Sequence, residues 1–453
     1  MKTKRLMAMG LAAVMTAGMA GCGSSSSTTS TASSSAGDVV STTDSAAAST
    51  ADSTAAASST SSVATETVGN GSKGTIKVWV ADAAVDFTTQ EIQQFVKDNS
   101  AAADYTFSVE PVGEADAATN MITDVNSGAD VYGFAQDQLA RLVSAGALET
   151  VADENVDGVK NDNDSGAVKA ATVGDTLYAY PLTSDNGYFL YYDKSVVTDP
   201  SDLDKILSDC AAAKKNFYME INNGWYQTAF FFGTGCKLTY DTDKDGNFTK
   251  CDVDYASDAG VEALKEIIKV QSSSAFQNGS SAGDATNVGA IVDGTWDAAT
   301  VKKLFGDNYA CAKLPSWTGT DGKTYQMSGF SGYKLLGVKP QEDDDKLAVC
   351  DDLAKYLSGE EVQLARYQAI GWGPSNLKDQ QSSDVQSDEA LKALNEQMQY
   401  DIPQGNYPND YWDLAKSLGD DIIQGKITSS TSDSDLKSTL QKFQDTCKSY
   451  AQG

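Results

Sequence analysis

The chain has 453 residues with 63 acidic and 34 basic side chains, which gives a formal net charge of −29. Such an acidic surface disfavours nucleic acid, anionic lipid and anionic polymers as partners, and it favours a neutral or cationic ligand. The sequence contains no histidine, which excludes serine-histidine and cysteine-histidine catalysis, histidine general bases and histidine-ligated zinc. An enzyme of this composition would depend on carboxylates, lysine, tyrosine or a cofactor.

Residues 1–21 have the pattern of a secretory signal peptide. A basic start is followed by an apolar stretch over 6–20, which is shorter than the roughly 20 residues of a membrane-spanning helix. Cys22 directly after Ala-Gly resembles a bacterial lipoprotein box, in which this cysteine is acylated, although Met19 stands where leucine is usual. The alternative is an ordinary signal peptide with an incidental cysteine.

Residues 22–73 are expected to form a disordered tether that begins at the acylated Cys22. Serine, threonine and alanine dominate this segment, and it has almost no large apolar side chains. Such a composition buries too little surface to offset the entropy of ordering. About 50 flexible residues have a mean reach of about 40 Å, which holds a folded body clear of a membrane.

The remaining residues alternate between strand and helix patterns. This order favours an α/β fold with mainly parallel sheets. The expected strands are 75–80, 105–109, 129–133, 177–181, 187–192, 289–292, 310–314 and 331–338. Helices are expected after a capping box at 88–91, around 121–125, over 137–145, 201–213 and 256–270, and in most of the chain from 347 onward.

Six cysteines follow Cys22, and an even number in an exported chain permits disulfides. Cys236 and Cys251 flank a predicted hairpin and are the preferred pair. Isolated buried thiols explain the spacing equally well. The six are Cys210, Cys236, Cys251, Cys311, Cys350 and Cys447.

Several short motifs occur in an order that is informative as a set, although no single one is diagnostic. They are Trp79 after the first strand, 129–132 followed by 134–137, 179–181, 293–296 and the pair 411–412. In this order, over residues 74–453, the chain resembles the extracellular solute-binding proteins of bacterial ABC sugar importers, most closely the maltose/maltodextrin-binding group.

This resemblance implies two α/β lobes of the periplasmic-binding-protein type, joined by a hinge of crossover strands, with the ligand in the cleft between them. Lobe one would contain 74–183 and 333–378, and lobe two would contain 188–327 and 379–453. The crossovers would lie at 184–187 and 328–332. Both crossovers contain glycine, which absorbs the backbone changes of domain closure.

The resemblance also implies a set of ligand-binding residues. Aromatic rings stack on the C–H faces of sugars, and carboxylates, amides and amines bind hydroxyls. The stacking residues would be Phe134, in place of the family's tryptophan, with Trp225, Trp296 and Trp412. The polar residues would be Asp82, Asp137, Gln138 (where the family has arginine), Asp185 and Lys416 (where arginine is usual). Each tryptophan is equally compatible with packing, and Asp137 with helix capping.

A segment of the predicted second lobe matches the oxygen spacing of an EF-hand calcium loop, with Gly246 at the turn. It ends in aspartate instead of glutamate and is flanked by strands, so an ordinary Asp-Gly hairpin is the favoured interpretation. The possible calcium ligands are Asp241, Asp243, Asp245, Asn247 and Asp252.

The leading hypothesis is a monomeric, lipid-anchored binding protein on the extracellular face of the membrane. It would capture neutral oligosaccharides, such as maltose or malto-oligosaccharides, by lobe closure and deliver them to the transmembrane subunits of an ABC permease. It would need no cofactor and would not be an enzyme. The alternatives are the same fold with another oligosaccharide or a cationic solute, and a surface glycoside hydrolase that uses paired carboxylates.

Overall fold

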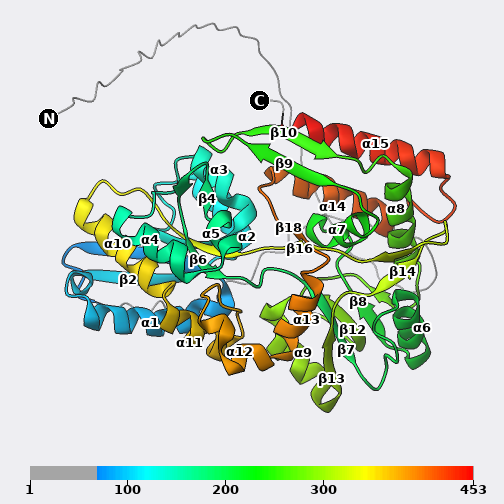
Figure 1. Cartoon of the computed structure of the whole chain (residues 1–453), viewed down its shortest axis with the longest axis horizontal. Coiled ribbons are helices and arrows are strands. Elements are labelled where there is room, and N and C mark those ends of the chain that lie inside the picture. Colours follow the sequence, from blue (N-terminus) through cyan, green and yellow to red (C-terminus); the bar gives the residue numbers. More distant parts are fainter. Residues whose placement is uncertain (1–68, 452–453) are drawn as a thin grey trace, which may run out of the picture. The chain divides into compact units, whose positions relative to one another are not determined.

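The computed structural model describes residues 69–451 (Figure 1). The predicted signal peptide, Cys22 and all but the last five residues of the predicted tether lie outside the described residues. Within residues 69–451, no helix is both long enough and apolar enough to cross a membrane.

A five-stranded sheet in the order β2-β1-β3-β17-β6 forms the centre of the first lobe. β1 pairs in parallel with β2 and β3, whereas β17 is antiparallel to both β3 and β6. Its strands are β1 (Gly74–Val80), β2 (Tyr105–Pro111), β3 (Val131–Ala135), β6 (Tyr180–Thr183) and β17 (Lys334–Val338). A small hairpin, β4 (Thr172–Val173) and β5 (Thr176–Leu177), and the helices α1 (Val85–Asp98), α2 (Glu114–Thr123), α3 (Leu139–Ser144), α4 (Asp153–Asp162), α5 (Ser165–Ala170), α10 (Asp344–Leu357) and α11 (Glu360–Ile370) complete the lobe.

The second lobe has its own five-stranded sheet in the order β11-β8-β12-β7-β13. Its strands are β7 (Phe189–Asp193), β8 (Asn216–Tyr218), β11 (Phe276–Gln277), β12 (Val288–Asp293) and β13 (Tyr309–Ala312). The helices are α6 (Leu203–Ala213), α7 (Gly224–Gly233), α8 (Asp258–Gln271), α9 (Ala298–Phe305), α12 (Ser383–Ser387), α13 (Glu389–Gln397), α14 (Asn409–Ile423) and α15 (Asp433–Ser449). The smaller pairs are β9 (Leu238–Thr242) with β10 (Phe248–Val253), β14 (Ser316–Thr318) with β15 (Thr324–Gln326), and β16 (Phe330–Ser331) with β18 (Ile402–Pro403).

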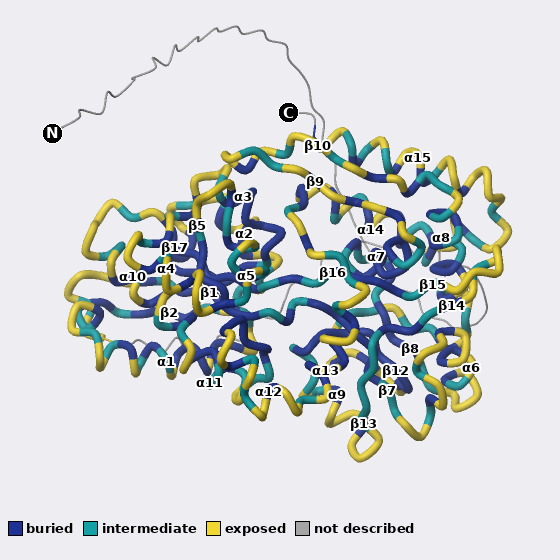
Figure 2. The backbone as a smooth tube through the Cα atoms, in the orientation of Figure 1, coloured by how far each residue is buried: buried dark blue, intermediate teal, exposed yellow. Residues whose placement is uncertain are grey.

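The first sheet lies in one hydrophobic core, and the second sheet separates two others, with alternate residues of β7 facing each of them. The strands β12 and β17 are buried along their whole length, because a sheet that is covered on both faces selects apolar runs. Figure 2 shows buried backbone running through both sheets and exposed segments on the outer helices. The α/β class and the two-lobed architecture predicted from the sequence are confirmed.

Two local predictions are wrong. The capping box does not start a helix, because α1 begins at Val85 and Thr89 lies inside it, where its hydroxyl donates to the Val85 carbonyl oxygen at 2.8 Å. The proposed disulfide between Cys236 and Cys251 does not form, and all six described cysteines are free thiols. Cys236 is buried near the hydroxyls of Thr234 and Ser257, whereas Cys251 lies on β10 opposite Tyr240.

Candidate functional site

A cavity of about 900 Å³ is lined by residues of both lobes. We call it the cleft. From the first lobe it takes the segments that follow β1 and β3, the start of α2 and the start of β17. From the second lobe it takes the start of α7, the segment after β12 and the first turns of α14. The loops that follow sheet strands commonly position ligand-binding side chains in α/β proteins, and the segments that follow β1, β3 and β12 line the cleft here.

Three tryptophans of the second lobe converge on the cleft from separate elements, and all three are half-buried. Trp225 begins α7, where the Asn223 side chain caps the helix by accepting from the Trp225 backbone N–H at 2.9 Å. Trp296 lies in a single 3-10 turn after β12, with its ring 5.9 Å from that of Trp225. Trp412 lies in the first turn of α14. These rings form an aromatic wall suited to a ligand with flat, weakly polar faces.

Lys416 lies on the same helix as Trp412, one turn later, and also lines the cleft. Its ammonium forms an ion pair with Asp420 at 2.6 Å, and more than half of its side chain is exposed. That Lys416 binds the ligand stays a prediction. Its charge is partnered by Asp420.

Two predicted acidic residues of the first lobe also line the cleft. Asp82 follows β1 and is exposed. Asp137 follows β3 and is only 3% exposed, and its carboxyl accepts from the Gln138 side-chain amide. Burial raises the pKa of Asp137 from 3.8 to about 7. The charge that Asp137 contributes to the cleft wall therefore depends on pH near neutrality.

Three other predicted site residues lie outside the cleft lining. Phe134 is fully buried in the core of the first lobe, packed 5.7 Å from the Tyr132 ring, so the expectation that it stacks on a ligand is corrected. The sheet is covered on both faces at β3, where Val131–Phe134 are all buried, so neither face of the strand is open to the cleft at Phe134. Gln138 is buried and bridges Asp137 and Arg141.

Asp185 is the third, and it lies in the first predicted crossover segment. It is 1% exposed, and its Oδ2 accepts from the Thr295 hydroxyl at 2.6 Å and from the Gly373 backbone N–H at 2.7 Å. Thr295 belongs to the second lobe and Gly373 to a loop packed on the first. The carboxylate therefore ties both lobes together at the crossover and is not open to the cavity.

Two of the three crossover glycines, Gly187 and Gly332, allow close approach between chain segments. A Cβ at Gly332 would lie 2.8 Å from the Gln404 side-chain oxygen and 3.1 Å from the Asn186 carbonyl oxygen. A Cβ at Gly187 would lie 2.8 Å from Leu394. Since neither glycine has a positive φ, the crossing geometry requires them for space and not for a left-handed conformation.

Lys334 was missed by the sequence reasoning and connects the two lobes. It begins β17, is 4% exposed, and lines the cleft. Its ammonium lies 3.7 Å from the ring centroid of Trp372 in the first lobe and 5.3 Å from that of Trp296 in the second. A buried ammonium between two indole faces is held by cation–π attraction. The sequence pattern of the strand did not indicate that Lys334 is buried, because a lysine at the start of a strand is ordinarily exposed.

The cleft lining is predominantly acidic. Of its charged residues, seven are carboxylates and two are lysines. The carboxylates that the sequence reasoning missed come from α2, from the segments that follow β8 and β12, and from α14. Acidic residues are so common in this chain that none of them stood out. The missed carboxylates are Glu114, Asp116, Glu220, Asp297 and Asp413.

The β9–β10 hairpin of the second lobe reaches helix α3 of the first. Gly246 at its tip has a φ of 83°, and a Cβ there would lie 2.1 Å from the Ala140 carbonyl oxygen. Next to it, the Ser144 hydroxyl donates to the Asn247 side-chain oxygen at 3.2 Å. This contact bridges the lobes in the described conformation.

The same hairpin holds the possible calcium ligands, and the structure does not gather them. Asp243 Oδ1 instead accepts from the backbone N–H groups of Asp245 and Asn247, both at 2.9 Å, and so stabilises the turn. Asp241 and Asp252 lie on the two strands. Within residues 69–451, no group of three or more acidic or cysteine side chains is placed to hold a metal ion.

Comparisons with known proteins agree with this geometry. Residues 90–393 match the family described as bacterial extracellular solute-binding protein, whereas no curated protein matches the sequence. A structure solved with acarbose is 26% identical with a TM-score of 0.71, and the match covers 83% of this chain and 98% of that one. A maltodextrin-binding protein from L. casei, solved without ligand, is 25% identical with a TM-score of 0.68 and coverages of 83% and 99%.

A third similar structure shares the fold at lower identity. It is a maltose/maltodextrin-binding domain from Bdellovibrio bacteriovorus bound to maltotriose, with 16% identity, a TM-score of 0.66 and coverages of 82% and 99%. The family match extends over both lobes and most of the folded chain. The chain belongs to the bacterial extracellular solute-binding protein family.

Proposed function

We propose that this chain is the substrate-binding protein of an ABC importer that captures neutral oligosaccharides, with maltose or malto-oligosaccharides as the preferred class. The observation that carries the proposal is the convergence of Trp225, Trp296 and Trp412 on one cleft between two lobes. Similar structures that were solved with acarbose and with maltotriose support the same ligand class.

The cleft supplies the two kinds of contact that sugar recognition needs. Indole faces bury the C–H faces of pyranose rings, and carboxylates such as Asp82 accept hydrogen bonds from hydroxyls. Closure of the lobes would bring the first-lobe acids and the second-lobe tryptophans onto opposite sides of one ligand. Asp185 and the crossover segments would act as the pivot of this motion.

A second candidate keeps the fold and replaces the sugar with a cationic solute. Seven carboxylates against two lysines in the lining favour this ligand electrostatically. The aromatic wall favours the oligosaccharide, because each ring offers more contact area to a flat sugar than to a small cation. Competition between maltotriose and an organic cation, measured by calorimetry, separates the two candidates.

The family and its binding-protein relatives support a role in binding and not in catalysis. A glycoside hydrolase would release reducing sugar from a malto-oligosaccharide. We expect no release above the buffer control.

We also propose that the protein is a monomer anchored through acylated Cys22 to the extracellular face of the membrane. The anchor would keep it near the transmembrane subunits of its permease and so raise their effective concentration. A Cys22→Ser variant should lose metabolic labelling with palmitate and appear in the culture medium. Equal labelling of the variant would refute the anchor.

The experiment that tests the ligand class is calorimetric titration with maltotriose and acarbose. Trp296→Ala removes one ring of the wall, and the loss of such an anchor costs about 2 kcal/mol, or about 30-fold in affinity. The matched control is Trp317→Phe, since Trp317 is buried in the second-lobe core and its Nε1 has no partner within residues 69–451. The control should bind like the natural protein. Failure of every malto-oligosaccharide to bind the natural protein would refute the ligand class.

A further inference from the structure

The cleft contains a cation that belongs to the chain itself. The Lys334 ammonium lies 3.7 Å from the ring centroid of Trp372 and 5.3 Å from that of Trp296. Both distances fall within the range of about 6 Å over which an aromatic ring attracts a cation. We call these two rings the cage. Aromatic cages in proteins commonly hold the ammonium group of a ligand, whereas this cage holds an ammonium of the protein.

The strand that carries Lys334 fixes its place in the cleft. Lys334 lies opposite Ala135 of β3 and opposite Thr183 of β6, so its backbone is paired on both sides. The pairing with β6 shifts register directly after Lys334, and such irregularities re-aim a side chain relative to a regular strand. The ammonium therefore reaches the cage from an inner strand of the sheet and not from a loop.

The two rings of the cage come from different lobes. Trp372 is 4% exposed and belongs to the hydrophobic core of the first lobe. The backbone N–H of the next residue, Gly373, donates to the buried Asp185 carboxylate at 2.7 Å, which holds this loop in place. Trp296 belongs to the second lobe and is also part of the aromatic wall. A ligand ring that stacks on Trp296 would therefore lie next to the Lys334 ammonium.

The ammonium has no hydrogen-bond acceptor in the described part of the protein. Within residues 69–451, Lys334 forms no ion pair and its Nζ donates no hydrogen bond, although the residue is only 4% exposed. Burial of unused ammonium donors is costly unless a partner is supplied. The Nζ is not one of the fully enclosed polar atoms without a partner, and Lys334 lines the cleft. An acceptor oxygen of a ligand in the cleft can therefore reach it.

The two lysines of the cleft differ in this respect. Lys416 is paired with Asp420 at 2.6 Å, whereas the charge of Lys334 is met by aromatic rings. A cationic solute would find the cage occupied and a like charge beside it, despite the seven carboxylates of the cleft lining. A neutral ligand would find unused N–H donors next to an aromatic surface. This combination suits a sugar, whose hydroxyls accept hydrogen bonds and whose C–H faces stack on rings.

We propose that Lys334 is the residue that makes the cleft specific for neutral oligosaccharides. Its ammonium donates hydrogen bonds to the hydroxyl oxygens of a sugar that is stacked on Trp296, and it excludes cationic solutes from the cage. The proposal rests on the proposed function. Of the two ligand classes considered there, it selects the oligosaccharide.

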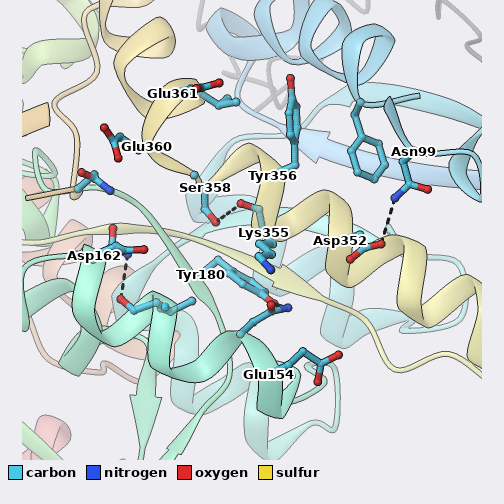
Figure 3. A pocket seen from close by; sticks show the side chains of 18 of the residues that line it. Asn99, Glu154, Asp162, Tyr180, Asp352, Lys355, Tyr356, Ser358, Glu360 and Glu361 are labelled. Carbon is cyan, nitrogen blue, oxygen red and sulfur yellow. Dashed lines mark hydrogen bonds between the residues drawn. The ribbon is translucent and has the colours of Figure 1, made fainter. Parts of the chain in front are cut away.

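The first test compares maltotriose affinities by calorimetry. Lys334→Met keeps the length of the side chain but removes its charge and its N–H donors. The loss of a hydrogen bond from a charged group should weaken maltotriose binding about tenfold. The matched control is Lys355→Met, which makes the same change at an exposed lysine of a separate first-lobe cavity of about 560 Å³ (Figure 3). This control should bind maltotriose like the natural protein.

The second test restores the ammonium from solution. Lys334→Ala removes the atoms that n-propylammonium contains, and so it leaves the cage open to that cation. Added n-propylammonium should raise the maltotriose affinity of Lys334→Ala several-fold, whereas potassium at the same ionic strength should not. The amine should leave Lys334→Met unchanged, because the methionine side chain fills the cage. A rescue that depends on the shape of the cation is a result that a general loss of stability would not give.

Two outcomes would overturn the proposal. One is a maltotriose affinity of folded Lys334→Met equal to that of the natural protein, and the other is an equal effect of n-propylammonium and potassium on Lys334→Ala. Urea unfolding establishes that the variants are folded, and Lys334→Met decides the question alone if Lys334→Ala does not fold.

The proposed function can fail separately from this proposal. If the natural protein binds no malto-oligosaccharide, the ligand class is wrong, and titration with n-propylammonium alone then tests the cage. Lys334→Ala should bind the amine saturably and the natural protein should not. Equal binding of the amine by both proteins would show that Lys334 does not fill the cage.

Discussion

The buried carboxyl of Asp137 should make the stability of the protein depend on pH in a direction that can be worked out. An unfolded chain ionises this group near pH 4, whereas burial holds its folded-state pKa at about 7. A carboxyl whose pKa is raised by folding favours the folded state most at pH values below its unfolded pKa. This stability is lost as the pH rises toward the folded pKa, so the window runs from about pH 4 to pH 7.

The magnitude follows from the two pKa values at about 1.4 kcal/mol per unit. Relative to a side chain that cannot ionise, the Asp137 carboxyl lowers the free energy of unfolding by about 1.6 kcal/mol at pH 5 and by about 4 kcal/mol at pH 8. The natural protein therefore loses about 3 kcal/mol of stability through this group between the two pH values. Asp137→Asn keeps the shape and the hydrogen bond from Gln138 but cannot ionise. The variant should therefore be more stable than the natural protein at pH 8. Its advantage in the free energy of unfolding should be clearly larger at pH 8 than at pH 5.

The assay is urea unfolding of both ligand-free proteins at the two pH values, followed by tryptophan fluorescence. Burial also raises the pKa of Glu266 and of Asp401 to about 7, so both proteins lose stability as the pH rises. The difference between them isolates Asp137. If both proteins lose the same free energy of unfolding between pH 5 and pH 8, the placement of Asp137 in a dry part of the cleft wall is wrong.

Two further predictions concern the bridge between the lobes and a buried ion pair. Gly246→Ala should push the hairpin away from α3 and weaken maltotriose binding. The control is Gly322→Ala, because Gly322 has a similar φ of 78° but an open surrounding, and this variant should bind maltotriose like the natural protein. Equal affinities of the two variants by calorimetry would refute the bridge. Burial disfavours the Asp130 carboxylate, but the Lys77 backbone N–H and the Lys346 ammonium outweigh burial and lower its pKa. Asp130→Asn should therefore cost about 3 kcal/mol at neutral pH, and this cost should disappear as the pH falls through the lowered pKa of Asp130, as measured by urea unfolding. A cost that stayed the same at neutral and at acidic pH would contradict this pairing.

The fold was largely predictable because its determinants are local and periodic. The β12 segment is an apolar run, and β1 alternates before it becomes apolar at Val78; both patterns indicate buried strands whatever lies around them. The start of α1 was misplaced because Thr88 fits a capping motif, but the turn that follows Asp82 continues directly into the helix. Tertiary packing decided that boundary, and a sequence pattern does not record it.

The cleft was only partly predictable. The tryptophans stood out because they are rare and large, but Phe134 was assigned to the cleft by its position in the family order, although its side chain faces the core. Lys334 was missed because its environment depends on Trp296 and Trp372, which are distant in sequence. Side-chain direction and long-range pairing are set by strand register, which the sequence does not display.

The most direct test of the central claim is a crystal structure of the protein with maltotriose. The account predicts sugar rings in the cleft between the lobes, stacked on Trp225, Trp296 and Trp412, with hydroxyls bound to Asp82. A crystal with maltotriose bound outside this cleft, or with an empty cleft at saturating sugar, would contradict it.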